Sequence, residues 1–169
     1  PERDRLEQLK AHLGLSEAVR FLGTRKDIPA ILAASNVCAL TSKMEANPVS
    51  ILEALSTRVP VVATRVGSVP TTVIDNETGF LVPAGDEAAF ADRVSLLLAQ
   101  PAEATRMGRN GRDLVCKDWS VDAMVRGYEN LILSIYQSKG LDVDFEMPDD
   151  DQMSESSSAG NADAEMLVG

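Results

Sequence analysis

Two carboxylates, Glu45 and Glu53, stand with seven residues between them in the stretch 41–63, TSKMEANPVSILEALSTRVPVVA. Pro48 lies between them, and proline is tolerated in the first turn of a helix because its missing N–H has no intrahelical role there. The first N–H groups of a helix lack partners and carry the positive end of the helix dipole, so they suit an anion such as phosphate. Glu53 would lie one turn into this helix, where it could accept from a neutral hydroxyl beside the anion.

The elements that must position these carboxylates are a strand, a loop, a helix and a second strand. Residues 37–40 are an apolar run too short for a helix, and residues 60–63 are a second run of the buried-strand type. Between them, apolar side chains recur at helical spacing: Ile51, Leu52 and Leu55. Alternating strands and helices favour a parallel α/β sheet, whose ligands bind beyond the carboxyl ends of the strands. Glu45 falls at such an end.

Upstream of this stretch the pattern predicts a helix, a strand and a second helix. Leucines at helical spacing predict an amphipathic helix that stops at Gly14, and AVRFLG predicts a strand over 18–23. Asp27 offers an N-cap for a helix over 28–35. Arg25 and Lys26 precede that cap, and surface charge or contact with a base or phosphate are both open readings for them.

Downstream the alternation continues with turns, one more strand and three helices. We expect a loop over Gly67–Pro70, a turn over 75–79 and a strand over 80–82. Asp86 should cap a helix over 87–99 that carries four apolar residues on one face: Phe90, Val94, Leu97 and Leu98. Helices from Pro101 to about Lys117 and from Ser120 onward should act as scaffold, the last with the stripe Met124, Tyr128, Leu131, Ile132 and Ile135.

Charge and composition divide the chain near residue 140. Residues 1–140 hold 17 acidic and 16 basic side chains, whereas residues 141–169 hold 9 acidic and no basic ones. The latter segment is Ser- and Ala-rich and poor in large apolar groups, so it cannot offset its ordering entropy and should be disordered. No basic face is apparent, which disfavours nucleic-acid binding. Cys38 and Cys116 lack any paired motif and should be free thiols in a reducing compartment.

Residues 45–55, EANPVSILEAL, resemble the signature of the retaining, nucleotide-sugar-dependent glycosyltransferases of the GT-B fold, the group 1 family with its Glu-x7-Glu motif. The similarity continues through VPVVATRVGSVP and NETGFLVPAGD and covers roughly residues 1–137. It implies an α/β fold, a Rossmann-like parallel sheet with flanking helices that forms the C-terminal half of a GT-B enzyme. We expect this partial nucleotide-sugar-binding domain over 1–139 and a disordered acidic tail over 140–169.

The resemblance also assigns roles to individual residues. Glu45 would be the catalytic residue, contacting hydroxyls of the donor sugar near its reacting carbon. The backbone around Asn47, Pro48 and Val49 would hold the diphosphate, although a turn residue explains Asn47 equally well. Glu53 would bind the ribose hydroxyls, with a solvated helix carboxylate as the plainer alternative. Family members stabilise the departing diphosphate with helix N-termini and basic side chains, so we expect neither a cofactor nor a metal.

Three positions depart from the family pattern. Ala46 replaces a frequent glycine, Arg58 stands in a turn where relatives place a small residue, and Thr71 replaces a frequent acidic residue. Arg58 would need a permissive backbone angle or a different turn. The Gly-rich acceptor domain and the basic pair of relatives have no counterpart in this sequence. We therefore expect this chain to belong with an N-terminal acceptor domain of the same protein and to be inactive in transfer without it.

Other functions remain as alternatives. A non-catalytic module that binds a nucleotide sugar would share the same residues. A GT-B epimerase or phosphorylase is disfavoured, because His12 and the few lysines form no acid–base or pyridoxal-phosphate site. We expect a cytoplasmic location, with peripheral binding at the inner face of a membrane left open, since the sequence contains no signal peptide or long apolar run.

Overall fold

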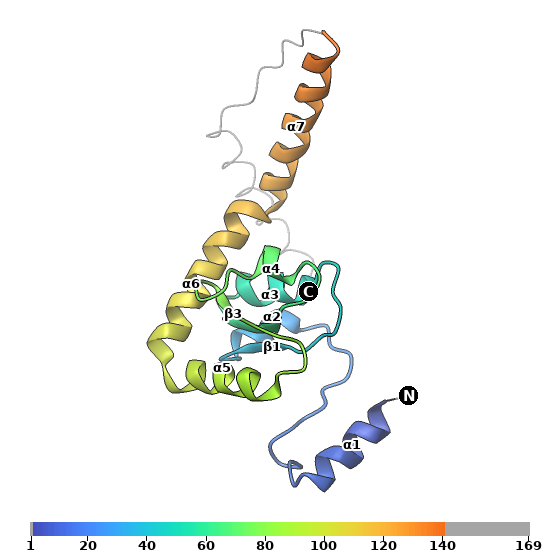
Figure 1. The fold of residues 1–169 in the computed structure, drawn as a ribbon, viewed down its shortest axis with the longest axis vertical. Coiled ribbons are helices and arrows are strands. Elements are labelled where there is room, and N and C mark those ends of the chain that lie inside the picture. Colours follow the sequence, from blue (N-terminus) through green and yellow to red (C-terminus); the bar gives the residue numbers. More distant parts are fainter. Residues whose placement is uncertain (1, 141–169) are drawn as a thin grey trace, which may run out of the picture. The chain divides into compact units, whose positions relative to one another are not determined.

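Three parallel strands form the sheet that the alternating pattern predicts. The computed structural model describes residues 2–140, and Figure 1 traces their elements along the chain. β1 (Cys38–Leu40), β2 (Val61–Thr64) and β3 (Gly79–Val82) are hydrogen-bonded in the order β1-β2-β3. Their register aligns Ala39 with Val62 and Val62 with Phe80. The α/β class and the parallel sheet are therefore confirmed.

Seven helices accompany this sheet within residues 2–140. They are α1 (Arg3–His12), α2 (Ile28–Ala33), α3 (Val49–Ser56), α4 (Val69–Thr72), α5 (Glu87–Ala99), α6 (Pro101–Asp118) and α7 (Val121–Ser138). Residues up to Ser120 form one compact unit, and a second unit begins at Val121. The predicted disordered tail lies, apart from Gly140, outside the described residues. The boundaries 1–139 and 140–169 stay predictions.

The two faces of the sheet are buried by different helices. Because successive side chains of a strand point to opposite faces, Val61 packs with Ile51 and Leu55 of α3, whereas its neighbour Val62 packs with Leu97 of α5. All four residues of β2 are buried. The alternation within β2 therefore joins two hydrophobic clusters, one on each side of the sheet. Both thiols are free, as expected, and Cys38 is partly buried in β1.

The turn between α3 and β2 depends on an unusual backbone angle. Arg58 has φ +62°, so the turn uses the permissive backbone angle that an arginine at this position was expected to need. Its carbonyl oxygen lies so close to α6 that a Cβ built on Gly108 would be 2.0 Å from it. Arg112 of α6 also donates to the Ser56 carbonyl over 2.9 Å. A glycine in α6 and a left-handed Arg58 together let this helix pack against the end of α3.

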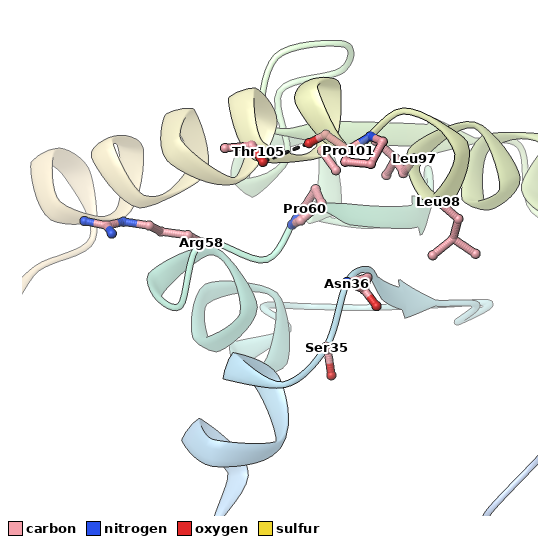
Figure 2. A pocket seen from close by; sticks show the side chains of 9 residues that line it. Ser35, Asn36, Arg58, Pro60, Leu97, Leu98, Pro101 and Thr105 are labelled. Carbon is pink, nitrogen blue, oxygen red and sulfur yellow. Dashed lines mark hydrogen bonds between the residues drawn. The ribbon is translucent and has the colours of Figure 1, made fainter.

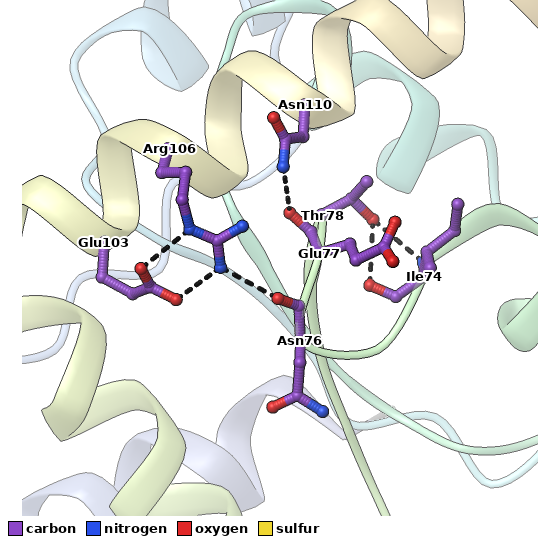
Figure 3. Close-up of polar contacts among 7 residues, drawn as sticks. All are labelled: Ile74, Asn76, Glu77, Thr78, Glu103, Arg106 and Asn110. Carbon is purple, nitrogen blue, oxygen red and sulfur yellow. Dashed lines mark hydrogen bonds and ion pairs between the residues drawn. The ribbon is translucent and has the colours of Figure 1, made fainter.

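The polar face of α6 holds the turn that leads into β3 (Figure 3). Arg106 forms an ion pair with Glu103 at 2.6 Å and donates to the Asn76 carbonyl at 2.9 Å. Asn110 donates to the Glu77 carbonyl at 3.1 Å. Asn76 itself has φ +64°, an angle that asparagine tolerates better than most residues. The turn before β3 is thus fixed by side chains that come from thirty residues further along the chain.

The segment over 18–23 is not a strand, contrary to the sequence prediction. Among the described residues the sheet consists of β1, β2 and β3, and the segment 18–23 does not pair with any of them. The Phe21 ring instead lies 5.7 Å from the Arg3 guanidinium carbon and 5.6 Å from the Lys10 ammonium, both on α1. The Phe21 carbonyl also accepts from Arg3. Contacts with α1 therefore replace the pairing that a strand requires.

Three smaller expectations are also corrected. The Asp27 side chain makes no cap to α2, because its carboxylate is paired with Arg25. Val69 and Pro70 belong to the short helix α4 and not to a loop. Leu98 is 57% exposed although Leu97 is buried, so the apolar face of α5 that packs in the core contains Leu97 and not Leu98.

The helix α7 carries the predicted apolar stripe. Its five members are 43–61% exposed: Met124, Tyr128, Leu131, Ile132 and Ile135. Their spacing places them along one side of the helix. None of the helices that the structure describes is long and apolar enough to cross a membrane.

Candidate functional site

The predicted site residues gather where β1 and β2 end. The chain leaves β1 at Leu40 and passes through the loop 41–48 into α3, and it leaves β2 at Thr64 and passes through the loop 65–68 into α4. Because the strands are parallel, both loops lie at the carboxyl edge of the sheet. This edge is the ordinary location of ligand sites in open α/β folds.

The Glu45 carboxylate is held by a hydroxyl of its own loop. Ser42 Oγ donates to Glu45 Oε1 over 2.6 Å. The Ser42 carbonyl in turn accepts from Thr64 Oγ1 over 2.5 Å, which connects the loop to the buried end of β2. Glu45 is half-buried, whereas Thr64 is buried. A chain of two hydrogen bonds therefore runs from the sheet to the predicted catalytic carboxylate.

The backbones of the two loops touch at Glu45. The Ser68 N–H donates to the Glu45 carbonyl over 3.3 Å, and Ser68 Oγ donates to the Ala46 carbonyl. Gly67 has φ +51°, and a Cβ at this position would lie 1.8 Å from the Glu45 carbonyl oxygen. Only glycine permits this approach together with this backbone angle. The loop 65–68 therefore restrains the backbone of the loop that carries Glu45.

The amino terminus of α3 directly follows the loop that carries Glu45. Pro48 is the N-cap residue and is buried, and it stands one position before the first helical turn in which it was expected. Asn47 and Val49 are exposed. Pro48 offers no side-chain cap, and within residues 2–140 the N–H groups of Val49 and Ser50 have no hydrogen-bond acceptor, whereas the Ile51 N–H donates to the Pro48 carbonyl over 3.0 Å. Backbone N–H groups and the helix dipole make this end suited to an anion.

Glu53 follows Val49 by one helical turn and is exposed. Burial raises the pKa of the Cys38 thiol on β1, and the negative charge of Glu53 raises this pKa further. Glu53 therefore acts electrostatically on the strand that leads into the site. The structure brings Glu45, Asn47, Pro48, Val49 and Glu53 together on one loop and one helix end.

Arg25 and Lys26 are not joined to that group. Arg25 donates to both carboxylate oxygens of Asp27, at 2.8 and 2.6 Å. This pairing raises the pKa of the Arg25 guanidinium and lowers the pKa of the Asp27 carboxyl. Lys26 is exposed, and within residues 2–140 no hydrogen bond or ion pair links Arg25 or Lys26 to the loop 41–48. A role for them in ligand contact stays a prediction.

Two cavities lie at opposite edges of the sheet. One of about 290 Å³ is at the carboxyl edge, between the loop after β1, with Ser42 and Thr64, and the start of α5. The other, of about 340 Å³, is at the amino edge, between Asn36, Pro60 and the junction of α5 and α6 (Figure 2). None of the predicted site residues lines either cavity. Ser42 and Thr64, whose hydrogen bonds connect the sheet to Glu45, line the smaller cavity at the carboxyl edge.

Four residues of this site were not predicted as functional from the sequence: Ser42, Thr64, Gly67 and Ser68. Ser42 and Glu45 have the Ser-x-x-Glu spacing of a capping box, but they lie in the loop before α3, and Ser42 donates to the Glu45 carboxylate directly. That spacing could have signalled Ser42. Gly67 followed a predicted strand end, but its contact with Glu45 comes from tertiary structure that no local pattern reports.

The family model of glycosyl transferases group 1 matches residues 1–114, and the chain belongs to this family. It is 30% identical over 135 residues to N-acetyl-alpha-D-glucosaminyl L-malate synthase of Bacillus anthracis. That match covers 80% of this chain and 35% of the enzyme, so the chain spans about a third of the length of this curated relative.

Solved structures give the same result. The C-terminal domain of a glycosyl transferase group 1 family protein from Francisella tularensis is similar with a TM-score of 0.62 and 26% identity, over 70% of this chain and 63% of that chain. The Anabaena protein HepE in complex with UDP is similar with a TM-score of 0.74 and 28% identity, over 79% of this chain and 38% of that one. The structure of HepE in complex with UDP-glucose is similar with a TM-score of 0.71 and 27% identity, over 78% of this chain and 36% of that one. The chain therefore has the fold of the C-terminal half of GT-B glycosyltransferases.

Proposed function

We propose that this chain is the donor-binding half of a retaining glycosyltransferase that moves a hexosyl group from a nucleotide sugar to an acceptor. The proposal is carried by two carboxylates, Glu45 and Glu53, that flank the uncapped amino terminus of α3 at the carboxyl edge of the sheet. Support also comes from the Anabaena relative, whose structures contain UDP and UDP-glucose.

The amino terminus of α3 would bind the diphosphate. In the reaction the bond between the anomeric carbon and the diphosphate oxygen breaks, an acceptor hydroxyl oxygen bonds to that carbon, and the hydroxyl proton passes to the departing diphosphate. Negative charge then develops on the departing diphosphate, where the N–H groups of Asn47 and Val49, on either side of Pro48, and the helix dipole would stabilise it. This backbone site replaces a metal in the proposal, so chelation with EDTA should leave donor turnover unchanged.

The carboxylates would bind neutral hydroxyls on either side of that diphosphate. Glu53, exposed and one turn into α3, would accept from the two adjacent ribose hydroxyls, because one carboxylate offers two acceptor oxygens. Glu45 would accept from hydroxyls of the donor sugar and place negative charge near the electron-poor anomeric carbon. Arg25 and Lys26 would meet the base or a phosphate from the segment that leads into α2.

The experiment is donor hydrolysis by the full-length protein that contains this chain, with water in place of the acceptor. UDP-, GDP- and ADP-glucose are supplied in turn, and proton NMR identifies the glucose anomer that is released before mutarotation. Retained configuration is expected for one of these donors, with a rate that falls by about a hundredfold or more in Glu45→Ala, as for loss of charge stabilisation in other active sites. Asp92→Asn, an exposed carboxylate of α5, is the matched control and should be unaffected.

Two results would contradict the proposal. Inverted configuration would exclude a retaining enzyme, and equal rates in Glu45→Ala and Asp92→Asn would remove Glu45 from the site. Binding of a nucleotide sugar without any turnover in the full-length protein would instead favour the non-catalytic module. Residues 1–169 alone should bind no acceptor and transfer no sugar, since the matching segment covers only 35% of the Bacillus anthracis relative.

A further inference from the structure

A hydroxyl and a carbonyl connect Glu45 to the sheet behind it. Thr64 Oγ1, at the buried end of β2, donates to the Ser42 carbonyl over 2.5 Å. Ser42 Oγ donates to Glu45 Oε1 over 2.6 Å. Because a serine hydroxyl has a single proton, this bond commits the Ser42 donor to one carboxylate oxygen. Among the described residues no hydrogen bond reaches Glu45 Oε2, so this oxygen has its full acceptor capacity for a ligand.

We infer that Ser42 is a positioning residue that orients the Glu45 carboxylate toward the donor sugar, with Thr64 holding Ser42 in place. This inference rests on the proposed function of Glu45. A glutamate side chain has several rotatable bonds, and a free carboxylate would have to be ordered each time that the sugar binds. The hydrogen bond from Ser42 fixes one oxygen beforehand, so the other oxygen meets the sugar without that loss of freedom.

The backbone of the loop does not depend on the Ser42 hydroxyl. Glu45 is held through its carbonyl by the Ser68 N–H, and Ala46 is held through its carbonyl by Ser68 Oγ. The close approach of Gly67 to the Glu45 carbonyl adds a third restraint. Removal of the Ser42 hydroxyl should therefore release the Glu45 carboxylate while the loop backbone and the amino terminus of α3 stay in place.

This separation gives the test a readout that a merely structural role would not move. The nucleoside diphosphate would bind the N–H groups of α3 and Glu53, whereas Glu45 would meet only the sugar. In the full-length protein, Ser42→Ala should lower the kcat of donor hydrolysis by about tenfold, the effect of about one hydrogen bond to a charged group. The Kd for UDP, GDP or ADP, whichever binds, should stay unchanged in the same variant.

Ser42→Thr is the conservative variant. It keeps the hydroxyl, and its extra methyl group can enter the cavity of about 290 Å³ that Ser42 lines. It should restore the kcat of the parent protein. A Ser42→Thr variant as slow as Ser42→Ala would contradict the inference, since the hydroxyl would then not be the active feature.

A double-mutant cycle tests whether Ser42 acts through Glu45. Ser42→Ala should have no further effect on kcat in a Glu45→Ala background, because the carboxylate that it orients is absent. Additive losses would overturn the inference, as would a Ser42→Ala protein whose nucleoside diphosphate Kd rises in parallel with its loss of kcat. If Glu45→Ala slows hydrolysis and Ser42→Ala does not, only the role of Ser42 is excluded. If Glu45→Ala has no effect, the proposed function fails and the role of Ser42 fails with it.

Discussion

Gly67 and Glu45 come from different loops, yet a Cβ built on Gly67 would lie only 1.8 Å from the Glu45 carbonyl oxygen. Gly67 also has φ +51°, in the left-handed region that glycine adopts without steric cost. A methyl group at this position would both strain the backbone and push the loop 65–68 away from the loop 41–48. The position of the Glu45 loop therefore depends on the absence of a side chain in its neighbour.

Gly67→Ala should lower the free energy of unfolding by about 3 kcal/mol, because overpacking and a left-handed alanine both cost energy. Gly85→Ala is the matched control: Gly85 has φ +87° but no atom within 4 Å of its Cβ position, so it should lose only about 1 kcal/mol. Urea unfolding of both variants measures the difference. Equal losses would mean that the contact with Glu45 does not restrain Gly67.

Gly108→Ala tests the packing of α6 against the turn at Arg58. The added methyl group would meet the Arg58 carbonyl oxygen at 2.0 Å, and the loss of stability should be about 3 kcal/mol. Gly127 lies inside α7 with nothing near its Cβ position, so Gly127→Ala should instead raise stability by up to about 1 kcal/mol through helix propensity. Opposite signs in thermal or urea unfolding are expected. A neutral Gly108→Ala would contradict the packing.

Asp86 and Asp27 precede helices in the same way, and the sequence predicts a cap for both. The structure shows a cap only at Asp86, whose Oδ1 accepts from the Ala89 N–H over 3.0 Å. Asp86→Ala should therefore cost about 1 kcal/mol of unfolding free energy, and Asp86→Asn should keep most of it. Asp27→Ala should cost less than Asp86→Ala, since an exposed ion pair with Arg25 contributes little. Equal losses at both positions would contradict the observed caps.

The sequence predicts the elements whose signals are local. The apolar runs that became β2 and β3, the stripe of Ile51 and Leu55, and the cap at Asp86 all follow from spacing within a few residues of one another. The prediction of a strand over 18–23 was wrong because its outcome depends on contacts that are not local. Its composition is that of a strand, but a strand also needs a partner, and Phe21 contacts α1 instead.

The candidate site likewise contains residues that a local pattern locates and contacts that only the tertiary structure creates. The local pattern places Glu45, Asn47 and Glu53 on one loop and the helix that follows it, as in the structure, while their roles stay predictions from the family resemblance. The contacts of Gly67, Ser68 and Thr64 with that loop join residues about twenty positions apart in the sequence, and only the parallel pairing of β1 and β2 brings them together. The sequence did not predict that Arg25 pairs with Asp27, and a ligand contact of Arg25 stays a prediction.

The Cys38 thiol predicts how stability depends on pH. Burial, and then the charge of Glu53, raise the pKa of this thiol above that of an unfolded chain. The folded protein therefore keeps a proton that the unfolded chain releases, so this contribution is full below the ordinary thiol pKa of about 8.5 and is lost as pH rises through the raised value.

Urea unfolding between pH 7 and pH 10 should accordingly show a fall in stability above about pH 8.5 that is smaller in Cys38→Ser. Cys116 is exposed, and Cys116→Ser should keep the slope of the parent protein. Glu53→Gln should make the fall in stability smaller, because the folded-state pKa of the Cys38 thiol moves back toward that of the unfolded chain when this charge is removed. A Cys38→Ser protein with the same fall as its parent would assign the pH dependence to another group.

A thermal-shift titration of the full-length protein with UDP, GDP and ADP tests the donor site most directly. A ligand that binds only the folded state adds about 2.7 kcal/mol at 100 times its Kd, so one of the three should raise the Tm saturably. Glu53→Gln should weaken this shift, while Asp92→Asn should reproduce that of the parent protein. No shift with any nucleotide, or an undiminished shift in Glu53→Gln, would contradict a nucleotide site at the amino terminus of α3.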